Sequence, residues 1–227
     1  MTAPRDDVFQ AIRRSLGVKG DERTRRQAVA DRLAQAPKGL IPARGQASGA
    51  ALLDVFRTQA ELAMATVARV ERPADVPAAV AAFLRNHNLP AAFRMGDDPR
   101  LSAMPWSDTQ LEVARGRTGG ADLNGVSHAF AAVAETGTLV MVSGPENPST
   151  LNFLPDNHIV VVAAKDVVGD YEAAFDRVRE AYGRGEMPRT VNFITGPSRS
   201  ADIEQTLLLG AHGPRRLHLI LVGDTES

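Results

Sequence analysis

The amino-acid sequence predicts an α/β protein with a mostly parallel sheet. Its second half contains four short apolar runs, which are T-L-V-M-V (138–142), H-I-V-V-V (158–162), V-N-F-I-T (191–195) and L-H-L-I-L-V (217–222). Their nearly continuous apolar character is typical of strands that are covered on both faces. A helical stripe from Tyr171 to Tyr182 separates the second and third runs, and Ile203 and Leu207 predict a helix between the third and fourth. Such crossovers predict parallel strands with right-handed connections.

The middle of the chain shows the same alternation. An apolar helix stripe comprises Leu52, Phe56, Ala60 and Ala63. A short strand is expected at 65–71, a helix from Val76 and a further strand at 91–95. The compact α/β domain is therefore expected to cover residues 48–224.

Residues 1–47 are expected to form a helical, basic extension. Val8, Phe9, Ile12 and Leu16 fall on one helical face, and residues 1–44 hold ten Lys and Arg against five Asp and Glu. A linker rich in proline and glycine follows these helices. The extension is interpreted either as an arm that docks a partner or as a pair of solvated helices.

The amino-acid composition of the chain excludes several classes of function. The formal net charge of the 227 residues is -1, so no overall field points to nucleic acid or to a membrane surface. Cysteine is absent, which excludes disulfides, thiolate nucleophiles and a self-ligated iron–sulfur cluster. The five histidines lack metal-ligand spacing, so no metal site is expected. No apolar segment resembles a membrane span or signal peptide, and a cytoplasmic location is expected.

Three segments are candidates for a binding site, because ligands of open α/β sheets usually bind beyond the carboxyl ends of the strands. The first is A-E-T-G-T (134–138), in which Glu135 is the only carboxylate between Asp122 and Glu146. Glu135 is a candidate acid, base or nucleophile, with Thr136 and Gly137 as ligand contacts. Alternatively, Glu135 accepts backbone hydrogen bonds or pairs with an arginine.

The second candidate segment is the long connection at 143–157. Connections of this length without secondary structure of their own are often binding loops. Ser149, Thr150 and Asn152 offer hydroxyl and amide contacts for a ligand. An inert, anchored loop is the alternative.

The third segment is T-G-P-S-R-S-A-D-I-E (195–204), together with G-A-H-G-P-R-R (210–216). A strand followed by a turn and a helix N-terminus presents free N–H groups that suit an anion. The candidate ligand contacts here are Gly196, Ser198, Arg199, Ser200 and His212. Acidic Asp202 and Glu204 oppose an anion at this helix end, and neither a P-loop nor a dinucleotide fingerprint is present.

Taken in order, A-E-T-G-T-L-V-M-V, P-S-T-L-N-F-L-P-D-N-H-I-V-V-V, I-T-G-P-S-R-S-A-D-I-E and G-A-H-G-P-R-R-L-H-L-I-L-V resemble the lactate-utilisation protein C family, also called the LUD domain family. The resemblance covers roughly residues 129–222. It implies a three-layer α/β domain related to the glucosamine-6-phosphate deaminase, ribose-5-phosphate isomerase and CoA-transferase group of folds.

The resemblance also implies a role in oxidising L-lactate to pyruvate together with iron–sulfur partner proteins. No intrinsic cofactor is expected, and this chain is expected to be a non-redox subunit that binds a small anionic ligand. Two alternatives stay open: a scaffold or regulatory subunit without a ligand, and a CoA- or phosphate-dependent transferase that uses Glu135. Some family members carry an arginine where this chain has Ser149 and Thr150, so the cationic candidates for binding the anion are Arg199, Arg215 and Arg216.

Overall fold

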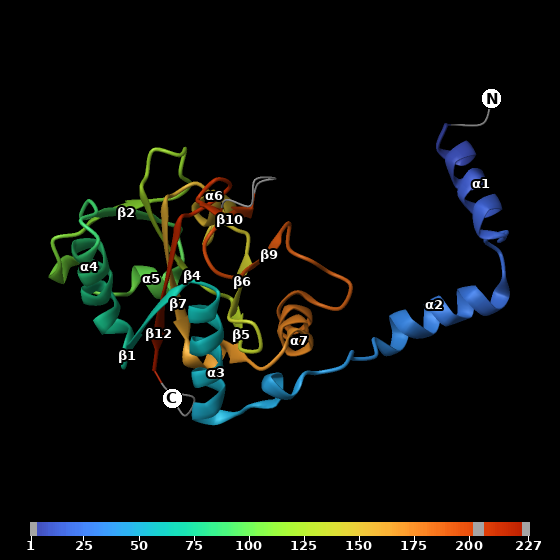
Figure 1. Ribbon diagram of the computed structural model, residues 1–227, viewed down its shortest axis with the longest axis horizontal. Helices are drawn as coiled ribbons and strands as arrows, with labels where there is room; N and C mark the ends of the chain where they lie inside the picture. The colour runs from blue at the N-terminus through green and yellow to red at the C-terminus, as the bar shows by residue number, and fades with distance from the viewer. Residues whose placement is uncertain (1–3, 202–206, 224–227) are drawn as a thin grey trace. The chain divides into compact units, whose positions relative to one another are not determined.

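The computed structural model describes residues 4–201 and 207–223, and its contacts divide the chain into a unit of residues 1–40 and a unit of residues 41–227 (Figure 1). The two units are described separately below. The expected boundary at residues 47 and 48 stays a prediction.

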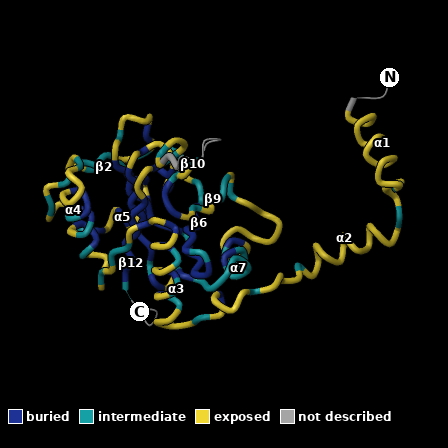
Figure 2. The backbone as a smooth tube through the Cα atoms, viewed as in Figure 1, coloured by how far each residue is buried: buried dark blue, intermediate teal, exposed yellow. Residues whose placement is uncertain are grey.

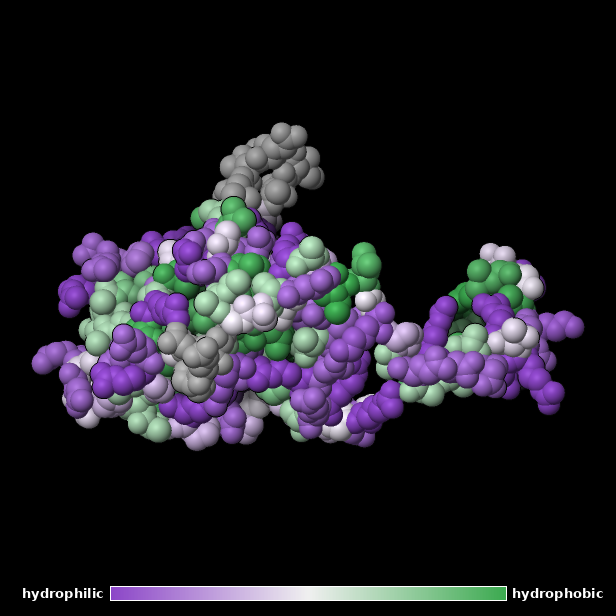
Figure 3. Space-filling view, turned by 90° about the horizontal axis from the view of Figure 1, so that it is seen from below, coloured by the Kyte–Doolittle hydropathy of each residue, from purple (hydrophilic) through white to green (hydrophobic). Residues whose placement is uncertain are grey.

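The first unit consists of two helices, α1 (Pro4–Leu16) and α2 (Arg23–Gln35). Acidic residues in the first turn of α1 and basic residues in its last turn complement the helix dipole. The predicted apolar face of α1 is exposed, from 41% at Phe9 to 64% at Leu16 (Figure 2). Hydrophobic and hydrophilic groups lie side by side on the surface of this unit in Figure 3. None of the helices in the described residues is long and apolar enough to cross a membrane.

Six parallel strands form the central sheet of the second unit, in the order β1-β12-β7-β4-β2-β3. Their bounds are β1 Thr66–Val70, β2 Ala92–Met95, β3 Glu112–Arg115, β4 Asn124–His128, β7 Asn157–Ala163 and β12 Arg216–Val222. The three central strands are almost completely buried. This burial explains why the runs at 158–162 and 217–222 are apolar throughout.

Helices and a second sheet cover the two faces of the central sheet. On one face, α4 (Val76–Asn86) and α5 (Pro99–Ser102) pack through residues such as Phe83 and Leu101 (Figure 1). On the other face, α3 (Gly49–Leu62) contributes Phe56 to a core shared with the second sheet. These layers confirm the predicted three-layer α/β fold.

The second sheet has the order β8-β5-β6-β9 and is mostly antiparallel. It comprises β5 Ala131–Val133, β6 Thr138–Val142, β8 Val167–Val168 and β9 Val191–Ile194, with α7 (Tyr171–Tyr182) packed on its outer face. The prediction that the runs at 138–142 and 191–195 continue one parallel sheet is therefore wrong. An apolar run predicts a covered strand but does not specify the strand with which it pairs.

Two paired strands are found on either side of residues 202–206, within the stretch where a helix was predicted between the third and fourth runs. Arg199–Ala201 forms β10 and pairs antiparallel with Leu207–Leu209, which forms β11. Ile203, Asp202 and Glu204 lie outside the described residues. Short apolar runs such as Leu207–Leu209 fit a strand as well as a helix, so the helix prediction was wrong here.

Short helices complete the unit. The connection at 143–157 contains α6 (Ser149–Phe153), so the prediction of a loop without secondary structure was also wrong. Four 3-10 helices are found at η1 Ala43–Gln46, η2 Pro73–Asp75, η3 Trp106–Asp108 and η4 Ala164–Asp166.

Candidate functional site

A cavity of about 280 Å³ lies where the amino ends of β7 and β12 meet the end of β9. It brings together five of the predicted ligand contacts, which are Asn152, Gly196, Ser198, Arg199 and His212. These residues come from α6, from the turn after β9, from the first residue of β10 and from the loop before β12. The cavity therefore lies at the amino edge of the central sheet, next to the carboxyl end of β9.

Two buried side chains give the cavity unsatisfied hydrogen-bonding groups. Asn152 and His158 line it, and each is only 1% exposed. The Asn152 side-chain oxygen and nitrogen and the His158 Nδ1 atom have no hydrogen-bond partner among the described residues. A buried polar group left without a partner costs about 1–3 kcal/mol, so such groups usually meet a ligand or an ordered water.

The His158 ring is held from its other side. Its Nε2 atom lies 3.0 Å from the Ser127 hydroxyl oxygen in β4. Burial lowers the pKa of His158 to about 3, so the imidazole is neutral at physiological pH. A neutral imidazole offers its Nδ1 atom to the cavity as a donor or as an acceptor, according to the tautomer.

The turn after β9 is built around Ser198. Its backbone N–H donates to the Pro214 carbonyl oxygen at 2.8 Å, and its hydroxyl oxygen accepts from the His212 N–H at 3.3 Å. Gly210 N–H donates to the Ser198 carbonyl oxygen at 3.0 Å. These bonds tie the two segments singled out from the sequence, 195–204 and 210–216, into one wall of the cavity.

Gly196 lets this turn approach α3 closely. Its φ is +71°, and a Cβ atom built on it would overlap the carbonyl oxygen of Ala63. Only glycine meets both conditions without strain. The glycine is therefore required by the backbone, independently of any contact with a ligand.

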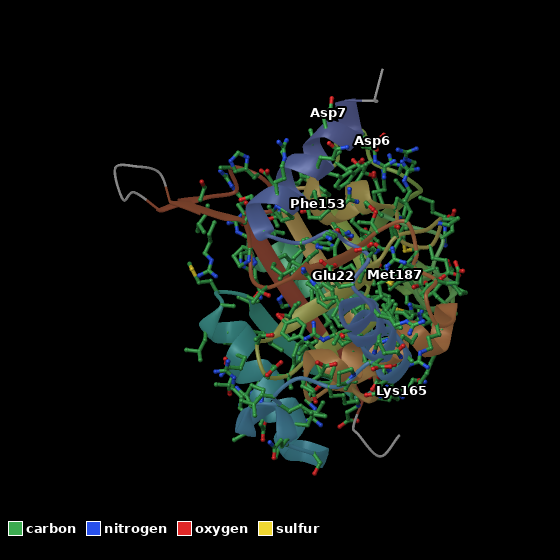
Figure 4. The ribbon with its side chains drawn as sticks, turned by 90° about the vertical axis from the view of Figure 1, so that its right-hand side faces the viewer. Asp6, Asp7, Glu22, Phe153, Lys165 and Met187 are labelled. Carbon is green, nitrogen blue, oxygen red and sulfur yellow. The ribbon has the colours of Figure 1, made fainter. Side chains whose placement is uncertain are left out.

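Arg199 makes the cavity electropositive. Its side chain is exposed, and no ion pair of Arg199 is found among the described residues. The described lining residues include no aspartate or glutamate. Phe153, which is labelled in Figure 4, adds an apolar wall and is 43% exposed. A guanidinium with neutral donors and acceptors around it suits a small carboxylate or phosphate.

Glu135 lies elsewhere. It is 6% exposed and belongs to the turn that joins β5 to β6, where its Oε1 atom accepts the Tyr171 N–H at 3.3 Å. Glu135 does not line the cavity, and this contact corresponds to the structural alternative raised from the sequence. Glu135 and Arg199 therefore do not line the same cavity.

Thr136 and Gly137 also serve the packing around this turn. The hydroxyl oxygen of Thr136 lies 2.7 Å from that of Thr138, which in turn lies 2.6 Å from that of Thr195. Gly137 packs against the backbone of α3 at Ala60. The turn thus touches the cavity only indirectly, through Thr195.

The remaining predicted contacts lie outside the cavity. Ser149 and Thr150, at the start of α6, line a different and wider hollow of about 730 Å³. Ser200 is in β10, where it pairs with Leu208, and is not among the lining residues of either hollow.

Sequence reasoning did not propose two polar residues of the cavity, His158 and Thr195, as ligand contacts. His158 was interpreted as a satisfied core or edge histidine, whereas only one of its two ring nitrogens has a partner. The available signal was its position near the amino end of a strand, immediately before the uninterrupted apolar residues 159–163. Thr195 was quoted as the end of a strand; it follows β9 directly and lines the cavity.

The fold and the cavity define a class of protein, namely a three-layer α/β protein with a small electropositive pocket at the amino edge of its central sheet. The chain belongs to the LUD domain family, whose model matches residues 53–222. It is similar to curated proteins called Lactate utilization protein C. The one from Geobacillus thermodenitrificans is 35% identical over 146 residues, which are 56% of this chain and 61% of that protein.

The corresponding protein from Bacillus subtilis is 37% identical over 101 residues, 44% of this chain and 42% of that protein. The chain thus matches about half the length of these curated relatives. A crystal structure of a DUF162 family protein from Deinococcus radiodurans superposes on this chain with a TM-score of 0.59 and 24% sequence identity. The superposition covers 78% of this chain and 99% of the Deinococcus chain. This likeness supports the fold alone.

Proposed function

We propose that this chain is a non-redox component of an L-lactate utilisation system and that it binds a small anionic ligand in the cavity of Asn152, His158 and Arg199. The observation that carries the ligand proposal is the set of three unpartnered, buried polar atoms on two lining residues. The names of the curated relatives support the system. The cysteine-free sequence supports the expectation that iron–sulfur clusters belong to partner proteins.

The chemistry of the lining groups favours an organic acid with a second polar group. Arg199 can pair with a carboxylate through two parallel hydrogen bonds. The Asn152 amide can both donate and accept hydrogen bonds. His158 Nδ1 either donates or accepts a hydrogen bond, according to the tautomer. An acid that carries a hydroxyl or keto oxygen next to its carboxylate would satisfy all three side chains. A cavity of about 280 Å³ holds such an acid together with ordered water.

The role in the system is tested by omission. The iron–sulfur proteins that co-purify with this chain are isolated from its own cell, and L-lactate-dependent reduction of an artificial acceptor is measured with and without the chain. We expect acceptor reduction to be lost without the chain and to return when it is added back. Full activity from the partner proteins alone would overturn the proposed role.

The site is tested separately with the purified chain. L-Lactate and pyruvate serve as probes in calorimetric titrations, and native mass spectrometry of protein from its own cell reveals any retained acid. Removing a charge-assisted hydrogen bond costs about 1.5–3 kcal/mol, so Arg199→Gln should weaken acid binding at least about tenfold. Arg117→Gln, in the neighbouring hollow, is the matched control and should bind as the wild type does. Equal binding by both variants would exclude the cavity as the anion site.

A scaffold subunit without a ligand is the second candidate function. The exposed apolar face of α1 and the local excess of basic residues favour it. In that case, deletion of residues 1–44 abolishes co-purification with the partner proteins. The Arg199→Gln variant, when it is added back to the partner proteins, restores acceptor reduction as fully as the wild-type chain does. Loss of acceptor reduction in Arg199→Gln with intact co-purification supports the ligand-binding function instead.

A transferase that uses Glu135 is supported least by the geometry. The carboxylate is buried and accepts the Tyr171 N–H, at a distance from the lining residues of the cavity. Glu135→Gln keeps an oxygen that can accept this N–H bond. We therefore expect Glu135→Gln to leave acid binding and acceptor reduction unchanged. A covalent adduct trapped on Glu135 would reverse this assignment.

A further inference from the structure

A second cavity, of about 560 Å³, lies at the opposite edge of the central sheet, beyond the carboxyl ends of β2 and β4. This is the edge at which parallel α/β sheets usually bind their ligands. The loop at 143–148 covers it, since Asp97 N–H donates to the Pro145 carbonyl oxygen at 3.2 Å. Gly96 sits directly beneath Glu146, whose carbonyl group would overlap any Cβ atom at residue 96. The loop at 143–148, which covers this cavity, is thus held against the end of β2.

Asn147 places an unused acceptor in this cavity. The residue is 6% exposed, and its Nδ2 atom donates to the Val142 carbonyl oxygen at 3.2 Å. That bond fixes the orientation of the amide, because a carbonyl oxygen accepts only. The Oδ1 atom of Asn147 is buried and has no hydrogen-bond partner in the part of the chain that the structure describes. It can be satisfied only by a donor from a ligand or from water.

His128 supplies a second acceptor. It is 6% exposed, and its Nδ1 atom lies 2.8 Å from the Ala129 carbonyl oxygen. Since that carbonyl accepts only, Nδ1 carries the hydrogen. Burial and the nearby Arg100 guanidinium lower the pKa of His128, so the ring is neutral and its Nε2 atom is an acceptor.

The charged groups of the second cavity are predominantly acidic. Asp98 is 2% exposed and is tied to Arg100 by a contact of 2.6 Å, so these two charges offset each other. Burial by itself would raise the pKa of Asp98, but its hydrogen bonds with Arg100 and the charge of Arg100 outweigh burial and lower it. Asp97 and Glu146 also line the cavity, and neither has an ion-pair partner among the described residues. The described lining side chains therefore include three carboxylates against one guanidinium. Arg100 also interacts electrostatically with Glu146, and Asp97 also lines the hollow that contains Arg117 and Arg189.

The walls of the cavity suit an organic group. Phe130 and Tyr182 line it, with ring centroids 6.2 Å apart. Aromatic faces attract organic cations. A metal ion is a poor alternative, because the described residues contain no group of three or more His, Asp or Glu side chains that could hold one.

We infer that this second cavity binds an organic ammonium group, that is, the amine end of a small molecule. Its N–H groups would donate to Asn147 Oδ1 and His128 Nε2, while its charge would be balanced by Asp97 and Glu146. A hydroxyl group could meet the acceptors but would not balance the charge of these carboxylates. The two cavities would thus select opposite charges at opposite edges of one sheet.

The probe for this site is putrescine, a four-carbon diamine, and butane-1,4-diol is the uncharged probe of the same length. Calorimetric titrations of the full chain measure the binding of both probes. They are carried out in low salt, where electrostatic attraction is least screened. We expect saturable binding of putrescine and at least about tenfold weaker binding of the diol, since a charge-assisted hydrogen bond contributes about 1.5–3 kcal/mol. Equal binding of the two probes, or no saturable binding of putrescine at about 10 mM, would overturn the inference.

Variants assign the binding to this cavity. Asn147→Leu and the double variant Asp97→Asn/Glu146→Gln should each weaken putrescine binding about tenfold or more. Both acidic side chains of the double variant are exposed, so it is expected to fold even if Asn147→Leu does not. Arg199→Gln, in the first cavity, should bind putrescine as the wild type does. Unchanged binding by the double variant contradicts the inference, whereas tighter binding in Arg199→Gln, which removes a repelling charge, would place putrescine in the first cavity.

Discussion

The Nε2 atom of His158 lies 3.0 Å from the hydroxyl oxygen of Ser127, and both side chains are at most 2% exposed. This bond joins the neighbouring strands β4 and β7 across their parallel ladder. It occupies one ring nitrogen and leaves the other at the cavity. Because burial lowers the pKa of His158 to about 3, the ring stays neutral in the folded protein over the whole physiological range.

His158 therefore makes stability depend on pH. In the unfolded chain its pKa is about 6.5, so between about pH 6.5 and 3 the unfolded state binds a proton that the folded state does not. The contribution is fully present above pH 6.5 and is lost progressively as the pH falls. We expect the free energy of unfolding to fall by up to about 1.4 kcal/mol per pH unit from this residue below pH 6. Urea unfolding at pH 7.5, 6.5, 5.5 and 5.0 measures it.

His158→Gln tests the assignment, because glutamine can still reach a hydroxyl but does not titrate. The pH dependence should become shallower in this variant. His218, whose pKa burial lowers to about 4, contributes a similar slope and remains in the variant. Identical slopes for wild type and His158→Gln would show that the folded state protonates His158 easily.

Asn152 is expected to be a residue whose removal harms binding but not folding. Its amide atoms have no partner among the described residues, so Asn152→Leu removes an unsatisfied buried group. The free energy of unfolding of the unliganded chain should rise or stay within about 0.5 kcal/mol, while acid binding in the first cavity is lost. Urea unfolding and calorimetric titration of the same preparation measure the two effects.

Asn124→Leu is the matched control for this prediction. Asn124 is also 1% exposed, but its Nδ2 atom donates to the Pro90 and Ala92 carbonyl oxygens and its Oδ1 atom accepts from Asn157. Its replacement leaves these partners unsatisfied and should cost about 2–4 kcal/mol. If both leucine variants were destabilised equally, Asn152 would have to be satisfied in the unliganded protein by ordered water.

The sequence predicted the strands better than their pairing. The runs at 158–162 and 217–222 are central strands because both faces are covered, which apolar composition reports directly. The run at 138–142 is equally apolar, yet it pairs antiparallel with β5 through the turn that contains Gly137. On its other side this run pairs antiparallel with β9, through contacts between residues far apart in the chain. Periodicity contains no information about those contacts.

The candidate site was predicted from residue types that favour sharp turns. This prediction identified cavity residues where the turn itself lines the cavity. The segment at 195–199 was identified because a glycine, a proline and a serine mark a sharp turn, and the structure places it in the cavity wall. Glu135 was selected for its isolation among apolar residues. In this fold the isolated carboxylate meets the Tyr171 N–H at the start of α7, an element 36 residues away in the chain. Spatial neighbours of that kind are set by the fold.

Gly137 should tolerate no side chain. Its φ is +66°, and a Cβ atom would overlap the backbone of α3 at Ala60. Gly137→Ala should therefore destabilise the chain by about 3 kcal/mol or more, because neither backbone can move without disturbing the core. Gly185 has a φ of +86° with nothing within 4 Å of a built Cβ, so Gly185→Ala should cost only about 1 kcal/mol of backbone strain. If urea unfolding showed a similar loss of stability for both variants, backbone strain alone, and not the overlap with α3, would account for the cost of the Cβ atom.

Thr138 is the centre of a hydroxyl cluster that links the start of β6 to α7 and to the residue that follows β9. Its hydroxyl oxygen lies 3.0 Å from that of Tyr171 and 2.6 Å from that of Thr195. Thr138→Val keeps the volume and removes the hydroxyl, so we expect a loss of about 1–3 kcal/mol in urea unfolding. Thr58→Val, on the exposed side of α3, should change stability by less than about 0.5 kcal/mol.

The cluster should also show coupling, because the hydroxyls of Thr138 and Tyr171 are partners of each other. In a double-mutant cycle of Thr138→Val and Tyr171→Phe, the second change should cost less once the first hydroxyl is gone, with an interaction energy of about 0.5–3 kcal/mol. Tyr171 also contacts Thr136, at 3.1 Å, so part of its loss remains in the double variant. Strictly additive losses would mean that the two hydroxyls stabilise the fold independently, and that the second sheet is held to α7 by apolar packing alone.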